Sequence, residues 1–179
     1  MSLKNLRSCR RILVVGCGGA GKSTLARRLG PLLGLPLVHL DTEYWQPGWV
    51  MTPKDDWLRR LDELLTEPEW IMDGNYGSSF ARRLVRADAV IYLDFSRLLC
   101  VTRALRRAWE GRGRTRPDMA PGCNEKIDLE FLHWIWTWSE HSRPQIEEPI
   151  AAAPPGVVRV VVRDPGELEQ QLGELEATA

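Results

Sequence analysis

The stretch that most constrains the fold is a glycine-rich turn between a short apolar run and an amphipathic segment. Ile12–Val15 is apolar and mostly β-branched, which is typical of a strand buried on both faces of a parallel sheet. The turn Gly16–Ser23 follows with the sequence GCGGAGKS. Leu25, Leu29 and Leu32 then recur at helical spacing. The order of strand, glycine turn and helix predicts an α/β fold.

The turn itself matches the pattern GxxxxGK[ST]. Glycines let successive backbone N–H groups point inward as a nest for anions, and the following helix adds its positive end. An ordinary glycine turn with a surface lysine is the alternative, but the strand and helix on either side favour a nucleoside triphosphate. Lys22 would reach its outer phosphates, and the Ser23 hydroxyl would bind Mg²⁺. We expect the nucleotide to contact Gly16, Gly18, Gly19, Ala20, Gly21, Lys22, Ser23 and Thr24.

Strand and helix patterns alternate along the rest of the chain. This alternation predicts one domain, residues 1–179, with a parallel sheet covered by helices on both faces. The N-terminal residues before Arg11 are expected to form a loose arm, Pro31 to break or kink its helix, and Thr52 to cap the next one. Further strands are predicted at 35–41, 69–76, 87–96 and 157–162, and helices from 53, at 78–87, 97–109 and 125–141, and from Asp164.

Overall charge and cysteine content exclude several classes of protein. Lys and Arg together number 24, as do Asp and Glu, so no global field points to nucleic acid or a membrane. The four cysteines form no CxxC pair, which favours a reducing cytoplasm over a disulfide scaffold or a zinc site. No apolar run approaches the roughly 20 residues that a membrane span needs.

Two aspartates end predicted strands at the sheet edge where the glycine turn lies. Asp41 follows LPLVHL, and Asp73 follows EWIM. A carboxylate there can position Mg²⁺ or its waters, and ligands of open parallel sheets bind at this edge. The alternative for each is a helix cap or a solvated loop carboxylate, and for Asp94 that alternative is favoured. We therefore expect Ser23 and Asp73 at the metal, the latter directly or through water.

An arginine-rich segment follows the fourth predicted strand. Seven arginines and one acidic residue, Glu110, lie between Arg97 and Arg116. Arginines that close over a transferred phosphoryl group would stabilise its charge, and the Gly- and Pro-rich residues 110–124 (the lid segment) would supply the motion. A solvated basic helix and a nucleic-acid patch are the alternatives. The favoured arginines are Arg103, Arg107, Arg112, Arg114 and Arg116.

Five ordered motifs resemble the DNA topology-modulation protein family, a group of adenylate-kinase-like P-loop proteins. They are GCGGAGKSTLARRL, LVHLDTEYWQPGW, WIMDGNY, ADAVIYLDFSR and GRTRPDMAPGCNEKIDLEFLHWIW. More distantly, the chain is similar to nucleoside monophosphate kinases and to shikimate and gluconate kinases. These resemblances imply a three-layer P-loop fold with a five-stranded parallel sheet in the order 2-3-1-4-5, a substrate segment after strand 2 and an Arg-rich lid. Arg116 is favoured because it lies in the motif TRPDM.

The acceptor site is less well defined by the sequence. Tyr44, Trp45 and Trp49 follow Asp41 in the predicted substrate loop, where they would either stack on a substrate or roof the core. Adenylate kinases carry an arginine four residues after the aspartate that ends strand 3, where Gly77 stands here. The resemblance implies that Arg82 or Arg83 replaces it, and that Arg143 binds phosphate. The three histidines show no metal or catalytic spacing and are expected to be structural.

The leading hypothesis is a cytoplasmic kinase that uses ATP and Mg²⁺. It would transfer the γ-phosphoryl group to a small acceptor such as a nucleotide, a nucleoside or another hydroxyl metabolite. Asp41 would orient or deprotonate an acceptor hydroxyl, and Arg107 would contact the nucleotide. The alternative is a nucleotide-dependent regulatory protein that acts on DNA topology or on a protein. The expected catalytic residues are Lys22, Asp41, Asp73, Arg112 and Arg116.

Overall fold

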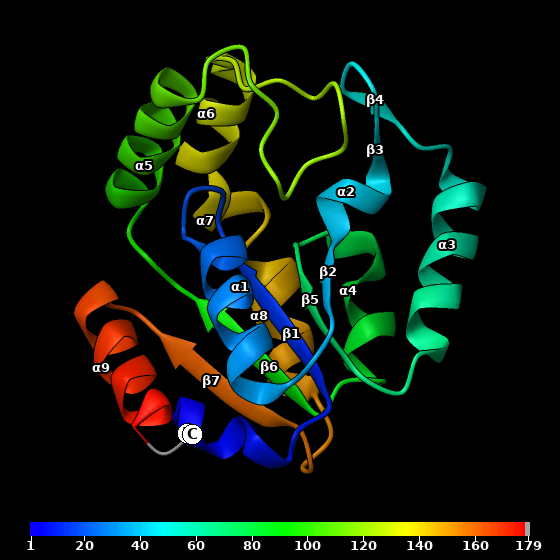
Figure 1. Ribbon diagram of the computed structural model, residues 1–179, viewed down its shortest axis with the longest axis vertical. Coiled ribbons are helices and arrows are strands. Elements are labelled where there is room, and N and C mark those ends of the chain that lie inside the picture. Colours follow the sequence, from blue (N-terminus) through cyan, green and yellow to red (C-terminus); the bar gives the residue numbers. More distant parts are fainter. Residues whose placement is uncertain (178–179) are drawn as a thin grey trace.

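A five-stranded sheet organises the protein, and all of its strands are parallel (Figure 1). The computed structural model describes residues 1–177. Along the sheet the strands follow the order β2-β5-β1-β6-β7, which is the predicted order 2-3-1-4-5 and confirms the expected fold class. The strands are β1 (Arg11–Gly16), β2 (Leu37–His39), β5 (Trp70–Asp73), β6 (Ala89–Leu93) and β7 (Val158–Val162).

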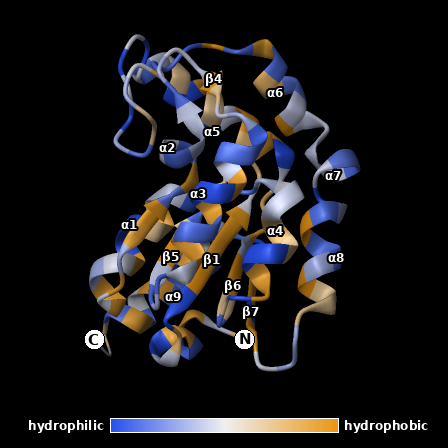
Figure 2. Ribbon diagram, turned by 90° about the vertical axis from the view of Figure 1, so that its right-hand side faces the viewer, coloured by the Kyte–Doolittle hydropathy of each residue, from blue (hydrophilic) through white to orange (hydrophobic). Residues whose placement is uncertain are grey.

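Helices cover both faces of this sheet. In Figure 2 the apolar strands stand between α1 on one side and α8 on the other. Ile12–Val15 of β1 is fully buried, as expected for the central strand of a doubly covered sheet. The helices are α1 (Lys22–Leu33), α2 (Leu40–Tyr44), α3 (Lys54–Thr66), α4 (Gly77–Leu84), α5 (Arg97–Glu110), α6 (Leu129–Trp136), α7 (Trp138–His141), α8 (Pro144–Ala152) and α9 (Pro165–Glu176). No helix within residues 1–177 has the length and apolar character to cross a bilayer.

The N-terminal residues are not a loose arm, contrary to the sequence-based expectation. They form a 3₁₀ helix, η1 (Leu3–Ser8), which packs against α9. Leu3 and Leu6 are fully buried, and the backbone N–H of Leu3 donates to the side chain of Gln171 at 3.0 Å. Leu3 and Leu6 are three residues apart and form an apolar face on this helix, although most residues around them are polar.

The expected break at Pro31 is also wrong, because α1 continues to Leu33. Pro31 lies in the last turn, where only one helical hydrogen bond is lost by its missing N–H. The helix ends instead at Gly34, which adopts a left-handed conformation and donates to the carbonyl of Gly30.

The predicted helix 125–141 is divided into two shorter helices. Asp128 caps α6 by accepting a hydrogen bond from the N–H of Phe131 at 3.0 Å, so the helix starts four residues later than its apolar pattern suggests. Thr137 separates α6 from α7. Glu125 is excluded from the helix and forms ion pairs with two arginines, which are described below.

The second strand and the loop after it also differ from the prediction. β2 ends at His39, and Asp41 lies in the first turn of the short helix α2 and not at a strand end. The aromatic loop contains a two-stranded hairpin, β3 (Trp45–Gln46) and β4 (Val50–Met51). The Thr52 hydroxyl donates to the carbonyl of Tyr44 at 2.5 Å and does not cap α3, whose N-cap residue is Pro53.

One carboxylate fastens the start of β1 to the start of β6. Asp88 accepts hydrogen bonds from the backbone N–H groups of Arg10 and Arg11 and from the Arg11 guanidinium, each at 2.9 Å. Burial alone would raise the pKa of Asp88, but these hydrogen bonds and the charge of Arg11 lower it below its ordinary value of 3.8. Its ionised form therefore stabilises the folded protein at neutral pH.

Asp88→Asn is expected to lower the free energy of unfolding by about 1 kcal/mol at pH 7, because an amide oxygen accepts with less charge and cannot replace both carboxylate oxygens. A group with a lowered pKa stabilises the fold above its unfolded pKa and loses that effect as the pH falls through the folded value. The difference between variant and wild type should thus shrink below about pH 4. Urea denaturation from pH 3 to pH 7 measures it, and a constant difference would contradict this role.

Candidate active site

The glycine turn forms a loop that wraps around the side chain of Lys22. The Lys22 amine donates to the carbonyl oxygens of Gly16 at 2.8 Å and Cys17 at 3.0 Å. Burial lowers the pKa of this amine, while the charges of Asp41 and Asp73 act in the opposite direction. Gly21, the N-cap residue of α1, adopts a left-handed conformation, so the turn and the first helical N–H groups face the same space. The loop thus presents both backbone donors and a cation to one anion.

A second tie links this loop to the end of β5. The side chain of Asn75 accepts from the N–H of Gly16 at 3.0 Å and donates to its carbonyl at 2.8 Å. Asn75 lies in the segment after Asp73, so the two segments that line the candidate site are held together at one residue pair. Sequence analysis did not single out Asn75, because its partner lies 59 residues away.

A cavity of about 510 Å³ opens in front of the loop. It lies at the carboxyl edge of the sheet, where ligands of open α/β proteins bind. Most of the residues predicted to bind nucleotide line it, together with several predicted to act on the phosphoryl group. These are Gly18, Gly19, Ala20, Gly21, Lys22, Ser23, Thr24, Asp41, Asp73, Arg103, Arg107 and Arg116.

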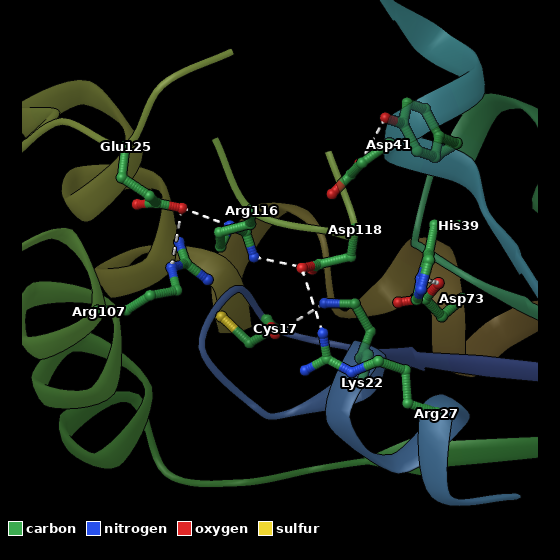
Figure 3. A network of polar contacts seen from close by, with 11 residues as sticks. Cys17, Lys22, Arg27, His39, Asp41, Asp73, Arg107, Arg116, Asp118 and Glu125 are labelled. Carbon is green, nitrogen blue, oxygen red and sulfur yellow. Dashed lines mark hydrogen bonds and ion pairs between the residues drawn. The ribbon is translucent and has the colours of Figure 1, made fainter. Parts of the chain in front are cut away.

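Two carboxylates face Lys22 across this cavity (Figure 3). Asp41 accepts a hydrogen bond from the Tyr76 hydroxyl at 2.6 Å. Its pKa is raised, because burial outweighs the opposing effects of Tyr76 and Lys22. Asp73 is buried and lies 2.5 Å from Nδ1 of His39. Burial lowers the pKa of His39, but the hydrogen bond and charge of Asp73 give a net increase. His39, expected to be structural, is therefore a direct partner of a site carboxylate.

The donors present suit Mg²⁺ bound together with phosphate. Ser23 and Asp73 both line the cavity and supply the hard oxygen atoms that this ion prefers. Within residues 1–177 no three His, Cys, Asp or Glu side chains gather to hold a metal by themselves. Mg²⁺ usually takes one or two protein oxygens and completes its shell with water and substrate phosphates, so this donor set fits that role.

The lid segment lies over the cavity and brings a carboxylate with it. Asp118 is 4% exposed and accepts from the Arg116 guanidinium at 2.9 Å, and it lies 3.7 Å from the Arg27 guanidinium of α1. Burial alone would raise the pKa of Asp118, but the charge of Arg116 and a hydrogen bond from Ser23 lower it. The lid segment therefore contacts α1 through the pair of Asp118 and Arg27.

A second buried carboxylate, Glu125, follows directly after the lid segment. Its Oε1 lies 2.5 Å from Nε of Arg116 and 3.4 Å from Nε of Arg107 (Figure 3). Burial is the main cause of a lowered pKa at Arg107, and the nearby Arg116 charge adds to it. Sequence analysis predicted both arginines but neither Asp118 nor Glu125. The motif TRPDM, which contains Asp118 next to the favoured Arg116, was the available signal.

The predicted aromatic residues pack against protein. The Tyr44 ring lies 5.1 Å from Trp45, 5.3 Å from Trp57 and 4.7 Å from Tyr76, measured between ring centres. Trp45 and Trp49 instead pack on a small cluster in the lid segment, formed by Met119, Ala120 and Cys123.

The predicted substrate arginines lie outside the cavity lining. Arg82 is exposed and pairs with Asp62 at 2.5 Å. Arg143 pairs with Asp94 and with Glu147, each at 2.7 Å. Arg112 lies in the lid segment and forms an isolated backbone bridge with Glu125. Arg114 likewise lies in the lid segment and does not line the cavity.

Arg83 is fully buried and braces the segment after β5. Its guanidinium donates to the carbonyl of Gly74 at 3.1 Å, to that of Asn75 and, more weakly, to that of Tyr76 at 3.4 Å. Burial lowers its pKa to about 9. This segment carries both Asn75 and Tyr76. Arg83 therefore holds two residues that contact the site, although it does not line the cavity itself.

Gly19 is a position where the site depends on the absence of a side chain. Its φ is +81°, and an added Cβ would lie 2.2 Å from the backbone oxygen of Cys100 in α5. We expect Gly19→Ala to cost about 2 kcal/mol or more in unfolding free energy and to weaken ATP binding, because the loop must move away from α5.

Gly173→Ala is the matched control, since nothing lies within 4 Å of a Cβ in that exposed turn of α9. It should raise stability by about 0.5–1 kcal/mol, as glycine does not suit a helix interior. Urea denaturation and ATP calorimetry on both variants make the measurement. Equal stability of the two variants would show that the contact with Cys100 places no constraint on the loop.

Solved structures of two shikimate kinases and a gluconokinase share this architecture. The chain resembles shikimate kinase from Bacteroides thetaiotaomicron, with a TM-score of 0.57, 18% identity, and coverage of 96% of this chain and 98% of that one. For shikimate kinase from Acinetobacter baumannii in complex with shikimate, the TM-score is 0.59 at 18% identity, covering 98% and 96%. A gluconokinase from Sinorhizobium meliloti 1021 gives 0.52 at 19%, covering 95% and 93%.

These likenesses show the P-loop kinase fold. No protein-family model matches the sequence, and no curated protein matches it. The resemblance to the DNA topology-modulation family therefore gains no support from these comparisons.

Proposed function

We propose that this chain is an ATP-dependent phosphotransferase that acts on a hydroxyl group of a small molecule. The observation that carries the proposal is the single cavity in which the glycine loop and Lys22 face Asp41, Asp73 and the lid arginines. A site for phosphoryl transfer needs a phosphate cradle, a place for Mg²⁺, cations for the transferred group and a position for the acceptor. The cavity supplies residues for each.

The nucleotide would lie along α1, with its phosphates on the loop. Gly18–Thr24 supplies backbone donors, the Lys22 amine and the Ser23 hydroxyl at one end of the cavity. Pro165, Leu168 and Leu172 of α9 also line the cavity, and their apolar side chains suit the flat, largely apolar face of a base. In similar kinases the loop before this last helix borders the adenine, and we assign the same place here.

Bound Mg²⁺ would supply positive charge to the phosphate oxygens, and Ser23 and Asp73 are the residues suited to hold it. Lys22, Arg107 and Arg116 would neutralise charge on the transferred phosphoryl group. Their contribution is electrostatic, because donors aimed at developing charge in a site that excludes water lower the barrier.

Asp41 would receive the acceptor's proton. One of its oxygens binds the Tyr76 hydroxyl, which fixes the carboxylate and leaves the other oxygen turned toward the cavity (Figure 3). Its raised pKa makes it a better base than an ordinary aspartate. An already phosphorylated acceptor would need no base, so this carboxylate favours an acceptor hydroxyl.

The test is an acceptor screen that measures ADP release with the wild-type protein. Calorimetry with Mg²⁺ and ATP or GTP first establishes uptake of the nucleotide. Faster ADP release with one class of acceptor than with water alone is the expected result. If folded protein binds no nucleotide, or if no acceptor accelerates ADP release, the proposal is contradicted.

The cytoplasm is the proposed location, because the four buried cysteines form no disulfide, as is usual in a reducing compartment.

A further inference from the structure

Three aspartates line the cavity beside its basic residues, and one of them, Asp118, is paired with two of the arginines. Asp41 and Asp73 lie there on the sheet side, and Asp118 approaches from the lid segment. Arg116, which also lines the cavity, is shared between Asp118 at 2.9 Å and Glu125 at 2.5 Å. Its charge is therefore already balanced by two buried acids.

The three arginines that sequence analysis assigned to the acceptor are occupied elsewhere. Arg82 turns outward to Asp62, and Arg143 pairs with Asp94 and Glu147. The Arg83 guanidinium donates to three backbone carbonyls in the segment after β5. None of these three side chains lines the cavity.

The overall charge of the cavity leads to the same conclusion. A nucleoside triphosphate with one Mg²⁺ carries a charge of about −2. The lining has six basic and four acidic side chains, a net charge of +2, so this complex alone balances it. A further carboxylate or phosphate on the acceptor would be repelled by Asp41, while Arg116 and Arg27 are already paired with Asp118. The charged lining residues are Lys22, Arg27, Arg28, Arg103, Arg107, Arg116, Asp41, Asp73, Asp118 and Glu169.

We infer that the acceptor is an uncharged hydroxyl compound, such as a sugar, polyol or nucleoside without a carboxylate or phosphate, and that Asp118 is a residue that excludes acidic acceptors. This inference rests on the proposed function. Carboxylate oxygens accept hydrogen bonds from hydroxyl groups, so Asp41 and Asp118 can bind the hydroxyl groups of an uncharged acceptor as well as repel an acidic one. In transfer, the acceptor oxygen forms a bond to the γ-phosphorus, the bond to the β-phosphate oxygen breaks, and the hydroxyl proton passes to Asp41.

Matched pairs of acceptors test the charge preference directly in the wild-type protein. Three pairs are suitable: glucose with gluconate, ribose with ribose 5-phosphate, and adenosine with adenosine monophosphate. In each pair the second compound carries a carboxylate or phosphate that the first lacks. In any pair whose neutral member is accepted, we expect kcat/KM to exceed that of the acidic member by at least about 100-fold.

Asp118→Asn should reduce that ratio by about tenfold, since it removes the repelling charge and keeps the shape. Asp62→Asn, at an exposed carboxylate paired with Arg82, should leave the ratio unchanged. An unchanged ratio in Asp118→Asn, with ATP calorimetry and thermal melting showing a folded protein, overturns the role of Asp118.

The outcomes separate this inference from the proposed function. Preferred transfer to acidic members overturns the inference and leaves the proposed function standing. No transfer to any member overturns both. Should Asp118→Asn fail to fold, the ratios measured for the wild-type protein still decide the charge class of the acceptor.

Discussion

Replacing Lys22 with alanine is expected to lower kcat for phosphoryl transfer by about 10³-fold while leaving the protein folded. The Lys22 amine is the cation that the glycine loop encloses, and it faces both Asp41 and Asp73 across the cavity. Without it, charge that develops on the outer phosphates has backbone donors but no cation inside the loop. Initial rates of ADP release, with the best acceptor from the screen, measure the loss.

The fold should survive because both carbonyls that Lys22 contacts keep another donor. The Gly16 carbonyl also accepts from Asn75 at 2.8 Å, and the Cys17 carbonyl from the N–H of Ala20 at 3.1 Å. Lys54→Ala, at an exposed lysine in the first turn of α3, is the control and should keep full activity. Wild-type rates in Lys22→Ala would remove the loop from the chemistry altogether.

Arg83→Ala is expected to cost about 3 kcal/mol or more in unfolding free energy, the largest stability effect that the structure suggests for one side chain near the site. Arg83 has no exposed surface, and its guanidinium serves the carbonyls of Gly74, Asn75 and Tyr76. Alanine would leave these carbonyls without that donor in a buried cavity, and each loss of this kind is costly. Urea or thermal denaturation measures the change.

The neighbouring Arg82 provides a control of the same residue type in the same helix. Its side chain is about half exposed and pairs with Asp62, so Arg82→Ala should cost less than about 1 kcal/mol. Similar losses for the two variants would mean that burial of the guanidinium has no structural value. Arg83→Ala should also lower activity, because Tyr76 and Asn75 lose the brace beneath them.

Features of the fold that are written locally in the sequence were predictable. The strand Ile12–Val15, the glycine turn and the leucines of α1 are contiguous, and each has a short-range physical cause. The cap of α9 is equally local, since Asp164 accepts from the N–H groups of Gly166 and Glu167. The sheet order followed from the family resemblance and is confirmed.

Features that depend on distant partners were not predictable in the same way. Arg82 and Arg83 are adjacent on one helix and equally basic, and only the packing of α4 decides which is buried. Pairing of Glu125 with Arg107 and Arg116 removes it from a helix that its sequence would allow. The pairing of His39 with Asp73 was likewise not predictable, because the two residues lie on neighbouring strands that are distant in the sequence.

The lid segment is attached to the hairpin β3–β4 as well as to α1. Gly48 donates to the carbonyl of Gly122 at 3.3 Å, the Trp49 indole to that of Asn124 at 3.1 Å, and the Cys123 thiol to that of Gln46 at 3.3 Å. A swing of the lid segment away from α1 must therefore either carry the hairpin along or break these bonds. If the hairpin follows, one gate serves both substrates, and the nucleotide and its acceptor enter and leave through the same opening.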